Sequence, residues 1–147
     1  MNSLDETVGY ALAQACKAHR NSISTELRTI ETDDGHLHVG QEMILMQLWH
    51  EEGLTQSQLA EQMCVEPPTV TKMLQRIEQQ NLIVRRPDCN DARVSRVYLT
   101  EAGRALRCHV EACWTRVEDR AMHGLSREER MLLRRLLLQV QHNLSGE

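Results

Sequence analysis

The hydrophobic pattern of this chain leaves the helical period in one segment only, and that segment restricts the folds that the chain can adopt. Up to residue 81, apolar residues recur at steps of three and four, which indicates amphipathic helices. Residues 82–86 and 94–99 have the character of strands, and the turn formers of 87–91 between them predict a β-hairpin. The helical period returns at residue 101. The sequence therefore predicts a mainly α-helical fold with a small β-hairpin.

Six helices are expected, and three of them have a capping box at their start. In such a box a hydroxyl residue is followed three positions later by Glu or Gln, as at Ser3, Thr55 and Ser126. Glu66 is expected to cap the fourth helix, where Pro67 suits the first position. The expected helices cover about 4–30, 40–50, a short stretch after Thr55, 67–81, 101–122 and a last stretch after Ser126.

The composition excludes several classes of protein. The 147 residues suit one domain, and 41% of them are hydrophobic, which is enough for a core. No uncharged apolar run approaches the ~20 residues that span a bilayer, so no membrane association is expected. Five cysteines without a CxxC pair argue against a disulfide framework and for the reducing cytoplasm. With two Trp, two Tyr and no Phe, platforms that stack single-stranded bases are not expected.

The net charge of −4 conceals a division along the chain. Residues 1–68 carry three bases and eleven acids, residues 69–107 carry eight bases and four acids, and residues 108–147 carry six of each. A basic segment inside an acidic chain suits a local site for a polyanion, because the other charges repel the polyanion elsewhere. A solvated charged face is the alternative interpretation of the same pattern.

The order of elements around the basic segment points to double-stranded DNA. Two short helices, a tight turn at 64–66, a longer helix and a hairpin describe a winged helix-turn-helix, whose second helix fits the major groove. An arginine on a narrow hairpin can enter the minor groove, where negative potential is focused, and Arg93 lies at the expected tip. The exposed face of the longer helix is expected to carry Thr69, Lys72, Gln75 and Arg76.

The chain resembles the MarR family of transcriptional regulators over nearly its whole length. The segment 54–61 is similar to the family's second DNA-binding helix, and 67–78 is similar to its recognition helix. Asn81 stands where the family usually has Gly, which is conservative because Asn also adopts left-handed backbone. The family's wing pattern D-x-R-x-x-x-V-x-L-T-x-x-G is matched by Asp91, Arg93, Val97, Leu99, Thr100 and Gly103.

The resemblance implies a homodimer that binds a pseudo-palindromic DNA operator. It implies an N-terminal dimerisation helix (1–35), a winged helix-turn-helix DNA-binding domain (36–100) and C-terminal dimerisation helices (101–147). Arg93 is implied to enter the minor groove, and Asp91 to orient the wing tip. The leucine-rich last helix independently favours a dimer, because so small a chain cannot cover it. The residues expected to form the DNA interface are Ser57, Pro68, Thr69, Thr71, Lys72, Gln75, Arg76, Arg85, Arg86, Asp91 and Arg93.

MarR-like proteins usually repress transcription and release DNA when a small aromatic or phenolic ligand binds between the helical base and the DNA-binding domain. The resemblance therefore implies a homodimeric repressor that is released by such an effector. A plain hydrophobic core is the alternative role for the residues concerned. The expected lining of the effector pocket is Tyr10, Leu12, Met43, Met46, Trp49, Leu106 and Val110.

Regulation by oxidation or by a metal ion is also consistent with the sequence. Cys89 lies in the wing among arginines, which activate a thiolate for oxidation, and Cys16 is the second redox candidate. The peroxide-sensing branch of the family has its reactive cysteine nearer the start of the first helix than Cys16. His109 and Cys113, four residues apart on one helix, are the candidate metal ligands.

Catalysis is not expected, because the sequence lacks G-x-S-x-G, H-E-x-x-H and a P-loop, and no cofactor is expected either. The remaining alternative is a winged-helix module that binds another protein. Salt distinguishes the two kinds of binding. DNA binding weakens steeply as salt rises, since counterions return to the phosphates, whereas binding to a protein is nearly independent of salt.

Overall fold

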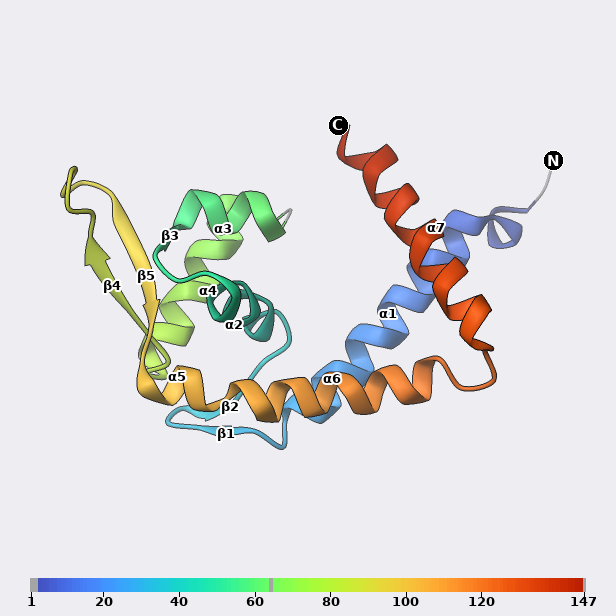
Figure 1. Cartoon of the computed structure of the whole chain (residues 1–147), viewed down its shortest axis with the longest axis horizontal. Helices are drawn as coiled ribbons and strands as arrows, with labels where there is room; N and C mark the ends of the chain where they lie inside the picture. Colours follow the sequence, from blue (N-terminus) through green and yellow to red (C-terminus); the bar gives the residue numbers. More distant parts are fainter. Residues whose placement is uncertain (1–2, 64, 147) are drawn as a thin grey trace.

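The computed structural model describes residues 3–63 and 65–146, and Figure 1 shows a mainly helical protein from which the hairpin of residues 83–99 protrudes. The helices are the 3-10 turn η1 (Leu4–Glu6), α1 (Val8–Leu27), α2 (Gln41–His50), α3 (Gln56–Met63), α4 (Pro67–Gln79), α5 (Glu101–Ala105), α6 (Arg107–Ala121) and α7 (Arg127–Ser145). The strands are β1 (Glu31–Thr32), β2 (Gly35–His36), β3 (Leu54–Thr55), β4 (Ile83–Pro87) and β5 (Ser95–Leu99). β1 pairs with β2, and the other sheet has the order β3-β5-β4. The prediction of a mainly α-helical fold with a small wing is confirmed.

Two of the predicted capping boxes are present. At the start of α3, the backbone N–H of Gln58 donates to the Thr55 hydroxyl at 3.2 Å, and the Gln58 amide oxygen accepts from the backbone N–H of Thr55 at 2.9 Å. Ser126 and Glu129 form the same reciprocal pair at the start of α7. These bonds satisfy backbone donors that a helix start would otherwise leave without partners.

The first helix begins later than predicted, and the capping box expected at Ser3 is wrong. Residues 4–6 form only a 3-10 turn, and the Ser3 side chain makes no capping hydrogen bond. Thr7 has extended backbone instead, and its hydroxyl accepts from the backbone N–H of Tyr10 at 3.1 Å. Glu66 also makes no side-chain capping bond, whereas Pro67 does take the first position of α4. Of the turn predicted at 64–66, Cys64 lies outside the described residues.

The helices α2, α3 and α4 pack with the three-stranded sheet as a winged helix-turn-helix. The buried side of α4 consists of Val70, Leu74 and Ile77, and α4 contacts both α2 and α3. The wing is the hairpin of β4 and β5, and β3 pairs with the other edge of β5. Just after α4, Asn81 has a φ of 58°, the left-handed backbone predicted for it. The opposite side of α4 therefore faces solvent next to the wing.

The helix predicted at 101–122 is interrupted at Leu106, which separates α5 from α6. Gly103 accounts for the position of α5, because a Cβ atom there would lie 2.1 Å from the carbonyl oxygen of Leu82. The Gly103 carbonyl also accepts the indole N–H of Trp49 from α2 at 3.0 Å. A side chain that bonds to a helix carbonyl is a recognised cause of a helix interruption. The short α5 thus packs with the wing, and α6 continues away from it (Figure 1).

The contact between α6 and α1 has a buried apolar part and an ionic part. Cys113 and Val117 of α6 are buried, as is Leu27 of α1. Glu26 accepts from Arg120 at 2.8 Å and from Arg116 at 2.9 Å. These two guanidinium groups hold the pKa of Glu26 below its usual value. Residues 31–36, which follow α1, form the β1–β2 hairpin, in a segment for which the sequence analysis expected neither a helix nor a strand.

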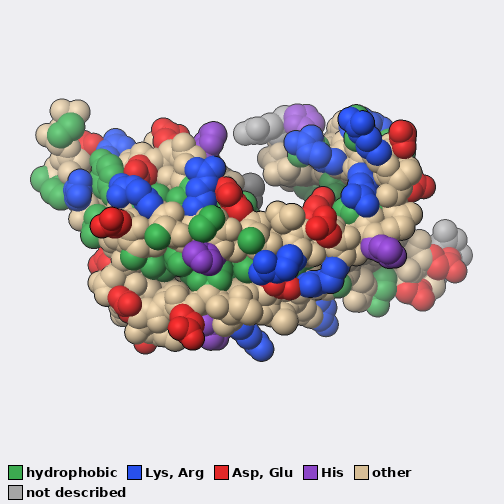
Figure 2. Space-filling model, turned by 60° about the horizontal axis from the view of Figure 1, so that its bottom comes forward, with side chains coloured by type: hydrophobic (Ala, Val, Ile, Leu, Met, Phe, Trp, Pro, Cys, Tyr) green, Lys and Arg blue, Asp and Glu red, His purple; other side chains and the backbone are tan. Residues whose placement is uncertain are grey.

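The last helix, α7, follows α6 through a turn and leaves most of its apolar side chains exposed. Figure 2 shows a hollow between this end of the molecule and the winged part. Within residues 3–63 and 65–146, no helix is long and apolar enough to cross a membrane. The exposed apolar residues of α7 are Met131, Leu132, Leu136, Leu137, Leu138 and Leu144.

Candidate nucleic-acid interface

The solvent side of α4 carries the polar groups that the periodicity predicted. Thr71 is half-buried: its hydroxyl donates to the Pro67 carbonyl at 3.0 Å and bonds to the Gln56 side chain. Thr71 therefore links α4 to α3 as well as lying near the exposed surface. The exposed members of the predicted DNA interface on α3 and α4 are Ser57, Pro68, Thr69, Lys72, Gln75 and Arg76.

Arg93 lies near the tip of the hairpin, and 92% of its side chain is exposed. Asp91 holds it, because the backbone N–H and the Nε of Arg93 donate to Asp91 Oδ1 at 3.0 and 3.1 Å. An Nη2 donates to Asp91 Oδ2 at 3.2 Å. The Arg93 guanidinium, followed by its backbone N–H, holds the pKa of Asp91 below its usual value. Asp91 uses two of the five guanidinium N–H groups, which leaves three for another partner.

Asp88 and Arg96 organise the hairpin below its tip, a role that the sequence analysis did not assign to either residue. The Asp88 carboxylate accepts from the backbone N–H groups of Asn90 and Asp91, both at 3.0 Å, and from Arg96 Nε at 2.5 Å. Chiefly the bond to Arg96 holds the pKa of Asp88 below its usual value. Arg96 also donates to the Gly53 carbonyl at 2.8 Å. An Asp with polar residues two and three positions later is typical of such a turn and could have indicated it.

Two arginines of the predicted interface are engaged within the protein. Arg85 Nε donates to Glu78 Oε2 of α4 at 2.7 Å, and 28% of the Arg85 side chain is exposed. The guanidinium carbon of Arg86 lies 5.1 Å from the centre of the Tyr98 ring. Arg85 thus connects the wing to α4, while the aromatic contact supports the position of Arg86.

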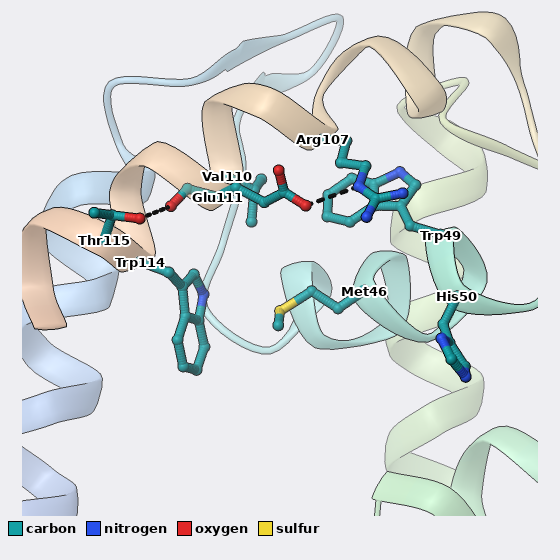
Figure 3. Close-up of a pocket in the computed structure, with 8 residues that line it drawn as sticks. All are labelled: Met46, Trp49, His50, Arg107, Val110, Glu111, Trp114 and Thr115. Atoms are coloured by element: carbon teal, nitrogen blue, oxygen red, sulfur yellow. Dashed lines mark hydrogen bonds and ion pairs between the residues drawn. The ribbon is translucent and has the colours of Figure 1, made fainter. Parts of the chain in front are cut away.

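A cavity of about 730 Å³ lies between α2 and α6 (Figure 3). Met46, Trp49 and Val110, which the sequence analysis assigned to an effector pocket, are among its lining residues. Tyr10, Leu12, Met43 and Leu106 are not. The complete lining is Met46, Trp49 and His50 of α2 with Arg107, Val110, Glu111, Trp114 and Thr115 of α6.

Trp114 was not among the predicted pocket residues, although it follows Val110 by four residues and so lies on the same face of α6. Figure 3 shows the Trp114 ring facing Met46 across the cavity. Arg107 and Glu111 form an ion pair of 2.7 Å in the wall near Trp49. The indole Nε1 of Trp114 is buried and has no hydrogen-bond partner within the described part of the chain.

The two redox candidates are both exposed: Cys16 lies on α1, and Cys89 lies in the turn of the wing. They belong to different parts of the molecule, and Cys89 is the one that lies beside the candidate interface. Any change of charge or size at the Cys89 thiol would therefore occur in the same hairpin that carries Arg93.

The two candidate metal ligands have different surroundings. His109 is exposed, and its Nδ1 lies 3.4 Å from the thiol of Cys108. Cys113 is buried, its thiol lies 3.6 Å from the Glu26 carbonyl, and burial raises its pKa. Among residues 3–63 and 65–146, no group of three or more His, Cys, Asp or Glu is arranged to hold a metal ion.

Comparison with known proteins matches the MarR family model to residues 37–95. A probable transcriptional regulator from Pseudomonas aeruginosa is 27% identical, covers 94% of this chain and 99% of its own, and has a TM-score of 0.82. The repressor CouR, solved with a 23-mer DNA duplex, is 27% identical, with 96% of each chain covered and a TM-score of 0.84.

BpsR of Bordetella bronchiseptica, whose DNA binding is regulated by 6-hydroxynicotinic acid, shares the fold at 22% identity. Its similarity covers 96% of this chain and 97% of BpsR, with a TM-score of 0.85. Residues 37–95 therefore match the MarR family model, and the chain shares its fold with solved transcriptional regulators over nearly its whole length.

Proposed function

We propose that this chain is a homodimeric, cytoplasmic repressor of transcription that binds double-stranded DNA at a pseudo-palindromic operator. A small aromatic or phenolic effector in the cavity between α2 and α6 releases the DNA. The observation that carries the proposal is the exposed polar side of α4 beside a wing on which Arg93 is 92% exposed. In the bound state α4 lies in the major groove and Arg93 lies in the minor groove.

The residues of α4 divide by the contacts that their side chains can make. Gln75 and Arg76 can form bidentate hydrogen bonds and read base edges. Thr69 and Lys72 contact bases or phosphates, and Ser57 contacts a phosphate at the start of α3. Pro68 and Thr71 lie at the edge of the same surface. On the wing, Arg86 adds a cation, while Arg85 acts chiefly by holding β4 on α4.

The homodimer is supported by the exposed apolar residues of α7, whose exposed fractions lie between 43% and 80%. Leu4 and Val8 at the start of the chain are 75% and 80% exposed. A second copy related by a two-fold axis would cover these groups and place two recognition helices about 34 Å apart, one turn of DNA. Sedimentation equilibrium should give twice the chain mass of 16.9 kDa, and a monomer at micromolar concentration contradicts the dimer.

Release by an effector is supported by the cavity. Its volume of about 730 Å³ lies within the range of small-molecule sites, about 300–1,000 Å³. The indole rings of Trp49 and Trp114 give it aromatic walls, and the ion pair of Arg107 with Glu111 supplies polar groups.

The test is fluorescence anisotropy with a duplex from upstream of the protein's own gene and a scrambled duplex, at several salt concentrations. We expect tighter binding of the native duplex and a steep loss of affinity as salt rises. A lack of DNA binding at every salt concentration, together with salt-independent binding of a protein, would support the protein-binding alternative.

The same complex then distinguishes the modes of regulation. Titration with salicylate, with peroxide and with zinc separates a ligand, an oxidant and a metal. Release of the DNA by salicylate supports regulation by an effector that binds in the cavity. Release by peroxide alone, reversed by a reductant and absent in Cys89→Ser, supports oxidation of the wing thiol instead.

A further inference from the structure

We propose that Trp49 transmits the state of the cavity to the DNA-binding surface through its hydrogen bond to Gly103. This inference rests on the proposed function and names the route by which the cavity and the DNA interface influence each other. Trp49 is here a positioning residue, which acts on the wing and on α4 without touching DNA.

Trp49 contacts both the cavity and α5. Its ring lines the cavity, and its Nε1 lies 3.0 Å from the carbonyl oxygen of Gly103 in α5. The two residues are 54 positions apart in the chain. A movement of the Trp49 ring away from α6 must therefore either pull α5 with it or break this bond.

Gly103 is in turn fixed to the end of α4. A Cβ atom at Gly103 would lie 2.1 Å from the Leu82 carbonyl, so α5 lies directly on the backbone there. Thr100, the cap of α5, donates its backbone N–H to the Leu82 carbonyl at 3.0 Å and its hydroxyl to the Asn81 carbonyl at 2.7 Å. Asn81 and Leu82 join α4 to β4. A displacement of α5 consequently reaches both the recognition helix and the wing.

A second tie joins the end of α2 to the same region. Glu52 accepts the backbone N–H of Leu99 at 2.8 Å and pairs with Arg104 of α5, also at 2.8 Å. Because Glu52 follows Trp49 by three residues, the end of α2 and α5 are connected at two points. They should move together as one body.

The opposite wall of the cavity is held to a different helix, α1. It is formed by α6, and α6 is held to α1 by the bonds of Glu26 to Arg116 and Arg120. The interruption at Leu106 separates this wall from α5. An occupant that pushes Trp49 from α6 thus acts on two helices that meet at this interruption.

The two tryptophans of the chain provide a matched pair of variants, because both line the cavity. Trp49→Phe removes an N–H that is bonded to Gly103. Trp114→Phe removes an N–H that has no partner within the described part of the chain. Each variant also retains one tryptophan, whose fluorescence then reports from a known position.

The first measurement is amide hydrogen exchange of residues 81–84 and 101–106 in the DNA-free protein. In Trp49→Phe we expect exchange in both segments to accelerate by about threefold or more, as for the loss of one hydrogen bond. In Trp114→Phe we expect no acceleration there. Equal exchange in the two variants would overturn the proposal.

The second measurement uses the reciprocity of coupled sites: if the cavity influences DNA binding, DNA binding must influence the cavity wall. In Trp114→Phe, where Trp49 is intact, saturation with the duplex should shift the Trp49 emission. In Trp49→Phe, the Trp114 emission should change less. An unchanged Trp49 emission while anisotropy shows bound duplex also overturns the proposal, and this arm does not depend on the folding of Trp49→Phe. Absence of DNA binding in the unmodified protein contradicts the proposed function instead, and the exchange measurement then still decides the link.

Discussion

Arg85 of the wing and Glu78 of the recognition helix are joined by an ion pair in which Nε lies 2.7 Å from Oε2. The two side chains are 28% and 47% exposed, so solvent screens the pair and its contribution to stability is at most about 1 kcal/mol. Its consequence is geometric, because it sets the distance between the two elements that reach DNA. Arg85 Nη1 also donates to the Gln56 side chain at 3.4 Å, which adds α3 to the same arrangement.

Arg85→Ala combined with Glu78→Gln should lower DNA affinity without changing its salt dependence, because the ion pair that is removed carries no net charge. Anisotropy across a range of salt concentrations measures both quantities. Glu78→Gln is the matched variant, since it removes the opposing charge and should increase the salt dependence. A slope that falls by about one unit in the double variant would instead show a direct contact between Arg85 and a phosphate.

Arg93→Ala should weaken binding to the native and the scrambled duplex by a similar factor. The Arg93 guanidinium has three N–H groups that Asp91 does not use, and the wing tip reads groove shape and charge more than sequence. The measurement is anisotropy with both duplexes. Unchanged affinity in this variant would contradict the assignment of the wing tip as a contact to DNA.

Gln75→Ala and Arg76→Ala should change sequence preference rather than overall affinity. Loss of one bidentate contact to a base costs about 1–3 kcal/mol of discrimination at that position. Competition with duplexes that carry single base-pair changes measures this loss. A uniform weakening for all of the duplexes would indicate that the two side chains contact only phosphates.

Gly103→Ala should destabilise the protein, because the added Cβ would lie 2.1 Å from the Leu82 carbonyl, and a clash with backbone costs about 1–3 kcal/mol. Gly9→Ala is the control: no atom lies within 4 Å of a Cβ there, and Ala in a helix gains about 0.5–1 kcal/mol over Gly. Urea denaturation gives both free energies of unfolding. Similar values for the two variants would contradict the close contact of α5 with Leu82.

The free energy of unfolding should depend on Glu42, which is 1% exposed and whose pKa is raised by burial. The folded state then holds the proton more tightly than the unfolded state does, so stability falls as pH rises from about 4.3, the ordinary pKa of Glu, through the raised value. Glu42→Gln keeps an acceptor for the Gly40 N–H, which lies 2.7 Å from the Glu42 carboxylate in the unmodified protein. The free energy of unfolding of this variant should depend less on pH over this range and should be larger at pH 7. Urea denaturation at several pH values tests the sign of this pH dependence. Greater stability of the unmodified protein at pH 7 would contradict it.

The elements that local chemistry determines could be predicted from the sequence. The boxes at Thr55 and Ser126, the left-handed Asn81 and the strand character of 82–86 each depend on residues close together in the chain. The exposed side of α4 follows from helical periodicity, since Val70, Leu74 and Ile77 bury the other side.

The features that the sequence did not reveal depend on contacts between distant segments. The interruption at Leu106 follows from the packing of Gly103 on Leu82 and from the bond that Trp49 donates across 54 positions. The cavity lining differed from the expectation for the same reason, because the packing of α2 beside α6 decides which side chains face the space. The pairing of Arg85 with Glu78 likewise needs the hairpin to lie on α4.

The uneven charge of the chain also affects how fast a duplex is found. Residues 69–107 have eight bases and four acids, whereas residues 1–68 have eleven acids and three bases. In the field of a polyanion such a protein experiences a torque, which turns its basic surface toward the duplex before contact. The effect extends over about 10 Å at 0.1 M salt, so association should accelerate as ionic strength falls. The acidic N-terminal half thus contributes to the rate of encounter by repulsion, through side chains that never touch the duplex.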